Sequence, residues 1–215
     1  MAAPLTLILD RPAGRLLSGA GQSFDLATRT WQPGAPPSGG RAVTVLEALA
    51  WLQRESGRPC RVPVGVVGPR EPSPAQFHTA EALGRALAEL GLTVLCGGRS
   101  GVMEAVCQGV AAAGGISVGL LPDAEPEAAN PHVTIPIATG IGIARNAIIA
   151  RAALCLVAVG SGLGTTAEVA LGLQFGKAVF GLEQAPAVQG IQLLPDVAAA
   201  TDAVAHVALS LPWPP

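Results

Sequence analysis

The chain has 215 residues; half are hydrophobic, only 13% are charged, and the net charge is −2. It contains no basic run, so the composition argues against sequence-independent binding to nucleic acid. Mean hydropathy is high at +0.47, but glycines, prolines or charges interrupt each apolar run well before the ~18 residues that a membrane-spanning helix needs. We therefore expect neither nucleic acid nor a membrane as a partner.

The first 60 residues predict an N-terminal extension of short strands, a loop and a helix. Strand-like segments cover 5–9, 15–18 and 23–30, and Gly19, Ala20 and Gly21 between the last two predict a β-hairpin. The proline- and glycine-rich segment 32–41 predicts a loop. A helix is expected to follow, because Thr44 and Glu47 have the spacing of a capping box and Gly57 can end the helix.

From Val62 onward, strand-like and helix-like segments alternate. The predicted strands are 62–67, 92–96, 116–121, 133–135, 154–159 and 178–181. Helices are expected from about 73, 101, 143, 164 and 202. This alternation predicts an α/β fold for residues 61–215, a doubly wound parallel sheet with helices on both faces and the hairpin extension in front of it. Ligands of such sheets bind beyond the carboxyl ends of the strands.

Four cysteines stand at positions 60, 96, 107 and 155, and none form a C-x-x-C pair. They are expected to be small buried hydrophobic residues, which argues against disulfides and a metal site. Free thiols suit a reducing compartment, and the N-terminus lacks the basic segment of a secretory signal. We expect a cytoplasmic protein.

A first glycine turn lies between the strand at 92–96 and the next helix. Its candidate phosphate-binding residues are Gly97, Gly98, Ser100 and Gly101. Glycine lets a ligand approach backbone amides, and a helix N-terminus offers free N–H groups to an anion. The alternative is a tight turn with no ligand.

The second turn, G-S-G-L-G-T-T-A-E, spans 160–168 and has the same design. Its candidate binding residues are Gly160, Ser161, Gly162, Gly164, Thr165 and Thr166. Glu168 has two interpretations: with Thr165 it has the spacing of a capping box, or it faces a ligand that the glycines hold. Neither a G-x-G-x-x-G fingerprint nor a G-K-[ST] phosphate loop is present, which disfavours a dinucleotide and ATP hydrolysis.

Arg145 follows a third glycine turn, T-G-I-G-I-A, which includes Gly140. A cation at the start of a helix opposes the helix dipole. Arg145 is therefore either a structural ion-pair partner or a guanidinium directed at a bound phosphate or carboxylate.

Five phrases occur in an order typical of one family: G-G-x-S-G-V-M-E-A-V at 97–106, G-G-I-S-V-G-L-L-P at 114–122, A-N-P at 129–131, T-G-x-G-x-A-R-N at 139–146 and G-x-G-x-G-T-x-x-E at 160–168. On these motifs the chain resembles the Lonely Guy superfamily of Rossmann-like, lysine-decarboxylase-like proteins. It is most similar to the branch that includes molybdenum cofactor carriers and many uncharacterised nucleotide-binding proteins. The resemblance covers about 62–210 and leaves the first 60 residues unexplained.

The resemblance implies a phosphorylated small-molecule ligand, with a nucleoside monophosphate as the first expectation. In the enzymatic branch, the residues matched by Arg145 and Glu168 serve a phosphoribohydrolase, which cleaves an N-glycosidic bond without a cofactor; Gly162, Gly164 and Thr165 match its phosphate turn. Gly160-Ser161 stands where Pro-Gly is usual, and Asn146 where lysine is typical, which weakens the case for hydrolysis. The alternative is a carrier of molybdopterin without catalysis. Family members also imply a homodimer or homotetramer.

Overall fold

The computed structural model describes residues 6–34 and 39–213. The chain forms two compact units. One is made of the described residues of Met1–Cys60 and Ala205–Pro215, and the other is Arg61–Val204.

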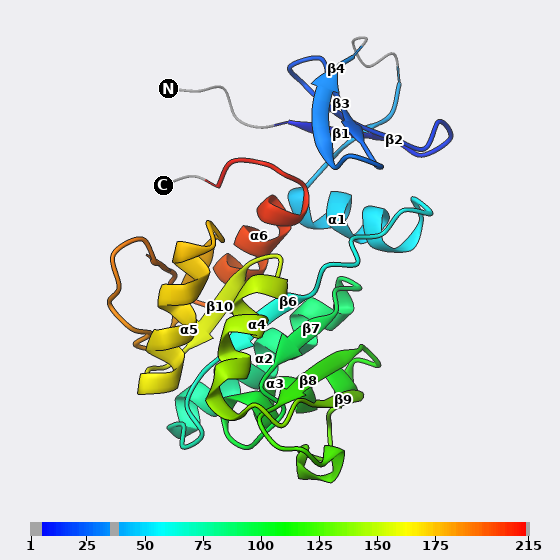
Figure 1. Cartoon of the computed structure of the whole chain (residues 1–215). Helices are drawn as coiled ribbons and strands as arrows, with labels where there is room; N and C mark the ends of the chain where they lie inside the picture. Colours follow the sequence, from blue (N-terminus) through cyan, green and yellow to red (C-terminus); the bar gives the residue numbers. More distant parts are fainter. Residues whose placement is uncertain (1–5, 35–38, 214–215) are drawn as a thin grey trace. The chain divides into compact units, whose positions relative to one another are not determined.

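The unit Arg61–Val204 is built on a seven-stranded parallel sheet with the order β12-β11-β10-β6-β7-β8-β9 (Figure 1). Its strands are β6 (Val64–Val67), β7 (Val94–Cys96), β8 (Ser117–Leu121), β9 (Ile135–Ala138), β10 (Leu156–Val159), β11 (Val179–Leu182) and β12 (Gln192–Leu193). The chain runs outward from β6 to β9, returns to the other side of β6 with β10, and continues to β12. The strand order therefore reverses between β6 and β10, which is where open parallel sheets bind ligands.

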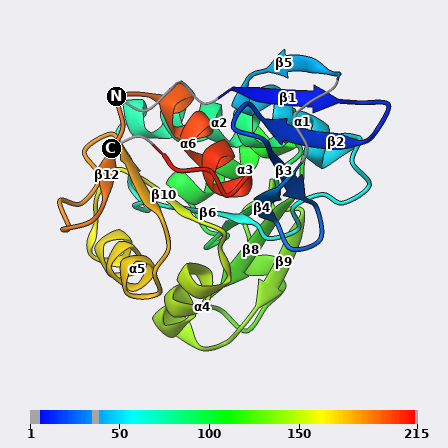
Figure 2. The ribbon, with the colours of Figure 1, turned by 90° about the horizontal axis from the view of Figure 1, so that it is seen from above.

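Helices cover both faces of this sheet. The helices α2 (Pro74–Glu89) and α3 (Val102–Ala112) pack on one face, and α4 (Arg145–Ala152) and α5 (Leu163–Gln174) pack on the other (Figure 2). Short 3₁₀ turns, η1 (Pro126–Ala128) and η2 (Gly142–Ala144), flank β9. The predicted doubly wound α/β fold is confirmed.

Glycines bring α2 and α3 into close contact. A Cβ at Gly109 would stand 1.9 Å from the Glu81 carbonyl oxygen, and one at Gly84 would stand 2.2 Å from that of Val106. The strands β6 and β10 are buried along their full length. All four cysteines are buried, as predicted.

The edge strand β9 carries Pro136 at its centre. The Thr139 N–H, just past the strand, donates to the Leu121 carbonyl of β8. Because the backbone alternates along a strand, the N–H groups of Ile135 and Ile137 also face β8, and the position without an N–H, Pro136, faces the open edge.

Two segments of this unit differ from the prediction. The strand expected at 133–135 lies two residues later, because Val133 turns back onto Asn130. The last helix, α6 (Val197–Ala208), begins earlier than residue 202. The Asp196 carboxylate accepts the Ala199 N–H at 2.8 Å, so an aspartate cap in D-V-A-A-A marks its start. The two-residue strand β12 was not predicted.

The N-terminal unit contains a five-stranded antiparallel sheet in the order β4-β3-β2-β1-β5, which has two strands more than the three strand-like segments predicted. The strands are β1 (Leu7–Asp10), β2 (Arg15–Ser18), β3 (Gln22–Asp25), β4 (Thr30–Pro33) and β5 (Arg41–Val43). The hairpin at Gly19–Gly21 exists between β2 and β3, but β4 and β5 lie at the two ends of the segment predicted as loop, part of which (35–38) is outside the described residues. The carbonyl of Leu209 accepts the Trp31 indole N–H at 2.8 Å and thereby joins the chain's last residues to this sheet.

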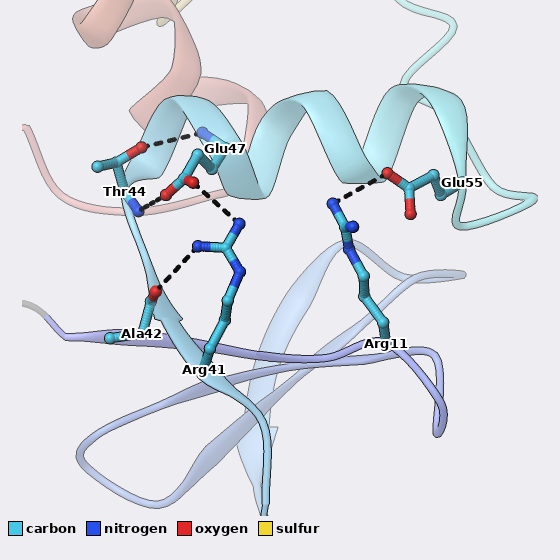
Figure 3. A network of polar contacts seen from close by, with 6 residues as sticks. All are labelled: Arg11, Arg41, Ala42, Thr44, Glu47 and Glu55. Atoms are coloured by element: carbon cyan, nitrogen blue, oxygen red, sulfur yellow. Dashed lines mark hydrogen bonds and ion pairs between the residues drawn. The ribbon is translucent and has the colours of Figure 1, made fainter.

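The helix α1 (Val45–Arg54) begins with the predicted capping box. The Glu47 N–H donates to the Thr44 hydroxyl at 3.1 Å, and the Thr44 N–H donates to the Glu47 carboxylate at 2.8 Å. The guanidinium of Arg41 on β5 bonds the same carboxylate at 3.0 Å, and Arg11 pairs with Glu55 at 3.2 Å (Figure 3). These exposed contacts join α1 to the sheet at both ends of the helix. In the described part of the chain, no helix is long and apolar enough to span a bilayer.

Candidate functional site

A cavity of about 390 Å³ lies at the carboxyl end of the parallel sheet, where the strand order reverses. All the residues around it belong to the unit Arg61–Val204. They come from the loop after β6, the turns before α3 and α5, and the start of α4: Val66, Val67, Gly68, Pro69, Arg70, Gly97, Met103, Pro122, Ile143, Arg145, Asn146, Gly162, Leu163, Gly164, Thr165 and Glu168.

The N-terminus of α5 opens into this cavity. Its N-cap residue is Gly162, so no side chain caps the first-turn amides. The hydroxyl of Thr165, on a residue that is only 2% exposed, lies among the cavity-lining residues and has no hydrogen-bond partner. A helix N-terminus with free N–H groups and a buried, unpartnered hydroxyl is suited to an oxyanion such as phosphate.

The capping-box interpretation of Thr165 and Glu168 was wrong. Thr165 lies inside the first turn of α5, two residues after its first residue Leu163, and the carboxylate of Glu168 bonds Arg145. Gly162 is the N-cap, so the helix begins upstream of the threonine.

Gly162 and Gly164 are not required by the fold. The backbone of Gly162 is extended, and a Cβ there would meet nothing closer than 3.7 Å. A Cβ at Gly164 would stand 3.9 Å from the Asn146 amide nitrogen. Any residue could adopt these positions without a clash, so the missing side chains leave open space beside the α5 amides. That space allows a ligand to reach the backbone.

Arg145 and Glu168 form a buried ion pair on the wall of the cavity. The Arg145 Nη1 atom donates to Glu168 Oε1 at 3.2 Å, and both side chains are less than a tenth exposed. The Arg145 Nε atom is buried without a partner. The guanidinium lies against Gly97, where a Cβ would stand 2.3 Å from Nη2, so glycine is needed there to admit the arginine.

Burial controls the ionisation of this pair. Loss of solvent raises the pKa of Glu168 to about 7, although the neighbouring Arg145 charge lowers it. Burial also lowers the pKa of Arg145, opposed by the Glu168 charge. A guanidinium remains charged at neutral pH, so near pH 7 the cavity contains a fixed cation beside a carboxyl group that can gain or lose a proton.

The turn before α3 is occupied by the protein itself. The Pro69 carbonyl accepts the Val102 N–H at 3.1 Å, and a Cβ at Gly101 would stand 2.4 Å from the Arg70 carbonyl oxygen. Asn130 binds the outer side of the turn through the Gly98 carbonyl. The first amide of α3 is thus taken by a carbonyl of the protein. Of the four predicted residues, only Gly97 borders the cavity; Gly98, Ser100 and Gly101 do not.

The remaining predicted residues do not border the cavity. Gly160 has φ +72° and faces the Gln76 side chain, and Thr166 donates its hydroxyl to the Gly162 carbonyl at 2.9 Å. Ser161 and Gly140 are exposed. Arg145, Glu168, Gly97, Gly162, Gly164 and Thr165 are the predicted residues that the cavity brings together.

Two polar residues of the cavity were not among the predicted binding residues. Arg70 was missed, and Asn146 was noted only as a departure from the lysine of the enzymatic branch. Arg70 follows the first strand of the sheet, and the switch-point rule could have identified that loop once the strand order was known. In the described residues, no three His, Cys, Asp or Glu side chains form a group that could hold a metal ion.

Comparison with known proteins identifies a family and several similar structures. The SLOG cluster4 family matches residues 61–208. The structure of the molybdenum cofactor binding protein of Rippkaea orientalis is 32% identical, with a TM-score of 0.65, over 67% of this chain and 96% of that chain. The Moco carrier protein of Chlamydomonas reinhardtii is 38% identical, with a TM-score of 0.64, over 70% of this chain and all of that one.

A protein of Archaeoglobus fulgidus described as uncharacterized is 36% identical over 130 residues, which are 60% of this chain and 85% of that protein. The family match covers the whole unit that contains the cavity and more than half of the chain. The chain belongs to the SLOG cluster4 family.

Proposed function

We propose that this protein binds and carries the molybdenum cofactor, a phosphorylated pterin, as cargo in the cavity at the N-terminus of α5. The observation that carries the proposal is the pair of buried polar atoms without partners, Thr165 Oγ1 and Arg145 Nε, next to open glycine positions. Buried polar groups are rarely left unpaired, and one without a partner in the empty protein suggests a partner in the ligand. The carriers at 32–38% identity support this choice of cargo.

The cargo's phosphate binds at the start of α5. The first-turn amides and the Thr165 hydroxyl donate to the phosphate oxygens, and Gly162 and Gly164 allow the close approach. Ile143 and Leu163, both more than four-fifths exposed, border the cavity and supply apolar surface for the pterin ring. Glu168 neutralises the buried Arg145 charge while the site is empty, so the cavity tolerates the arginine without a bound anion.

A pterin-loading assay tests this proposal. The purified chain is mixed with molybdenum cofactor, separated from free cofactor, and assayed for bound pterin by fluorescence after oxidation. Thr165→Val removes one donor, and a hydrogen bond to a charged group is worth about 1.5–3 kcal/mol, so at least tenfold weaker binding is expected.

Thr166→Val is the matched control, because that hydroxyl bonds the Gly162 carbonyl and does not border the cavity. It should retain most of the wild-type loading. Equal loading of both variants, or a wild-type protein that takes up no pterin, would refute the carrier proposal.

The Arg145–Glu168 pair supports a second candidate, a nucleoside monophosphate phosphoribohydrolase. With its pKa near 7, Glu168 is partly ionised at neutral pH, and its carboxylate could stabilise an oxocarbenium-like transition state at the ribose. Water would add at the sugar carbon as the bond to the base breaks, giving free base and ribose 5-phosphate.

Incubation with AMP followed by chromatography separates the two candidates. Adenine and ribose 5-phosphate released by wild type and abolished in Glu168→Gln would establish the hydrolase. Pterin loading without release of adenine would establish the carrier.

A further inference from the structure

Arg70 is a charged residue on the wall of the cavity. Arg145 is paired with Glu168, and the nearby Arg99 is paired with Asp123. No hydrogen bond or ion pair joins Arg70 to any other residue in the ranges that the structure describes, and its side chain is exposed. The cavity wall thus holds two arginines against one glutamate.

The excess positive charge is local. The unit Arg61–Val204 has seven Arg and Lys residues against eleven Asp and Glu residues, a net charge of −4. A net positive cavity in a negative unit attracts anions to that place.

The backbone fixes where Arg70 stands. Its carbonyl lies against Gly101 at the start of α3, and the preceding Pro69 accepts the Val102 N–H. Its charge is close enough to lower the pKa values of both Arg145 and Asp123. Asp123 follows β8, while the phosphate position at α5 follows β10.

The order of the strands gives the distance between the ends of β8 and β10. The strand β8 is three strand spacings from β10, with β6 and β7 between them. At about 4.8 Å per spacing, the two ends of this region are about 14 Å apart. Pro69 lies against the start of α5, 3.7 Å from where a Cβ at Gly162 would stand, and the Arg70 carbonyl lies against the start of α3, so the Arg70 backbone stands between these two helix starts.

We propose that Arg70 binds a second anionic group of the ligand, so that the site selects phosphate esters with another negative group at their far end. This rests on the phosphate position of the proposed function. A nucleoside monophosphate has no such second group, whereas the molybdenum cofactor has an anionic oxo-metal dithiolate in addition to its phosphate. Arg70 therefore favours the carrier over the hydrolase.

Two sugar phosphates that differ by one phosphate test the assignment. Calorimetric titration of the full chain with fructose 6-phosphate and fructose 1,6-bisphosphate gives a preference ratio. Wild type should bind the bisphosphate at least fivefold more tightly. Arg70→Gln should reduce the ratio to about twofold or less, because it weakens bisphosphate binding more than fructose 6-phosphate binding.

Arg85→Gln is the control, because Arg85 on α2 pairs with Glu81 and does not border the cavity; its ratio should equal that of wild type. A wild-type ratio near one, or an unchanged ratio in Arg70→Gln, overturns the Arg70 assignment while pterin loading still stands. A wild-type protein that binds neither fructose 6-phosphate nor pterin overturns the proposed function as well.

Discussion

Replacing Gly164 with alanine tests whether the start of α5 is shaped for a ligand instead of for the fold. The added Cβ would stand 3.9 Å from the Asn146 amide nitrogen, an ordinary contact distance. Alanine is up to about 1 kcal/mol more favourable than glycine in a helix. The empty variant should therefore be more stable by about 0.5–1 kcal/mol, which raises the melting temperature by about 1–4 °C for a chain of this size.

Ligand binding should change in the opposite direction. The new methyl group occupies the open space through which a phosphate reaches the α5 amides. Loss of one charge-assisted hydrogen bond, worth about 1.5–3 kcal/mol, weakens binding by at least tenfold. Differential scanning fluorimetry of the empty protein and the pterin-loading assay measure the two effects.

Gly172→Ala in the same helix is the matched control. A Cβ there would stand 2.4 Å from Leu156 Cδ1, deep in the core, so this variant should lose stability and keep its affinity for pterin. If Gly164→Ala is stabilised and binds pterin as tightly as wild type, the reasoning that the glycine serves a ligand is refuted.

Three further substitutions probe the site and the N-terminal unit. Thr165→Val should stabilise the empty protein in thermal melts by about 1–3 kcal/mol, because it removes a buried hydroxyl without a partner; a destabilised variant would show that the hydroxyl is satisfied. Glu168 has a folded-state pKa of about 7, above its ordinary value of 4.5, so the folded protein holds a proton that the unfolded chain releases between those pH values. The free energy of unfolding should fall by up to about 3 kcal/mol as pH rises from 4.5 to 7 and then level off; denaturant titrations across this range should show that slope in wild type and not in Glu168→Gln, and an equal slope in both would contradict the assignment. Thr44→Ala should destabilise α1 by about 1 kcal/mol through loss of its N-cap, seen as faster hydrogen exchange of the first-turn amides; unchanged exchange would mean that the Arg41–Glu47 contact alone holds the helix start.

The sequence predicted the parallel sheet because its strands are continuous apolar runs that end at glycine turns. The capping box at Thr44 was predicted because both of its hydrogen bonds are local. The same spacing rule failed at Thr165, because the glycines upstream allowed the helix to begin earlier. Local sequence patterns predict where a helix begins only when no other possible start lies nearby.

The candidate site was predicted only in part, because its residues are distant in the sequence. Arg145 and Glu168 are 23 residues apart, and only the order of the strands brings them to 3.2 Å. The resemblance to a family pointed to both residues, while the residues alone left both side chains with two interpretations. Arg70 was missed because its position at the switch point depends on which strand is central, and the order of strands in space is not a local property. In the N-terminal sheet, β4 was missed because 23–30 was predicted as one strand, whereas the chain turns between Asp25 and Arg29 and β4 pairs back onto β3. The strand β5 was missed because its partner, β1, is distant in the sequence.

The proline in β9 limits how copies of this protein can associate. An open sheet edge is a template for a strand of another molecule, and long apolar edges promote aggregation. At Pro136 the open edge of β9 lacks a donor, so a ladder added there would be interrupted at its centre. Ile135 and Ile137, nearly half exposed on the same strand, remain available to pack against a neighbour. A continuous strand ladder at this edge is thereby disfavoured, which favours side-chain packing over a growing fibre.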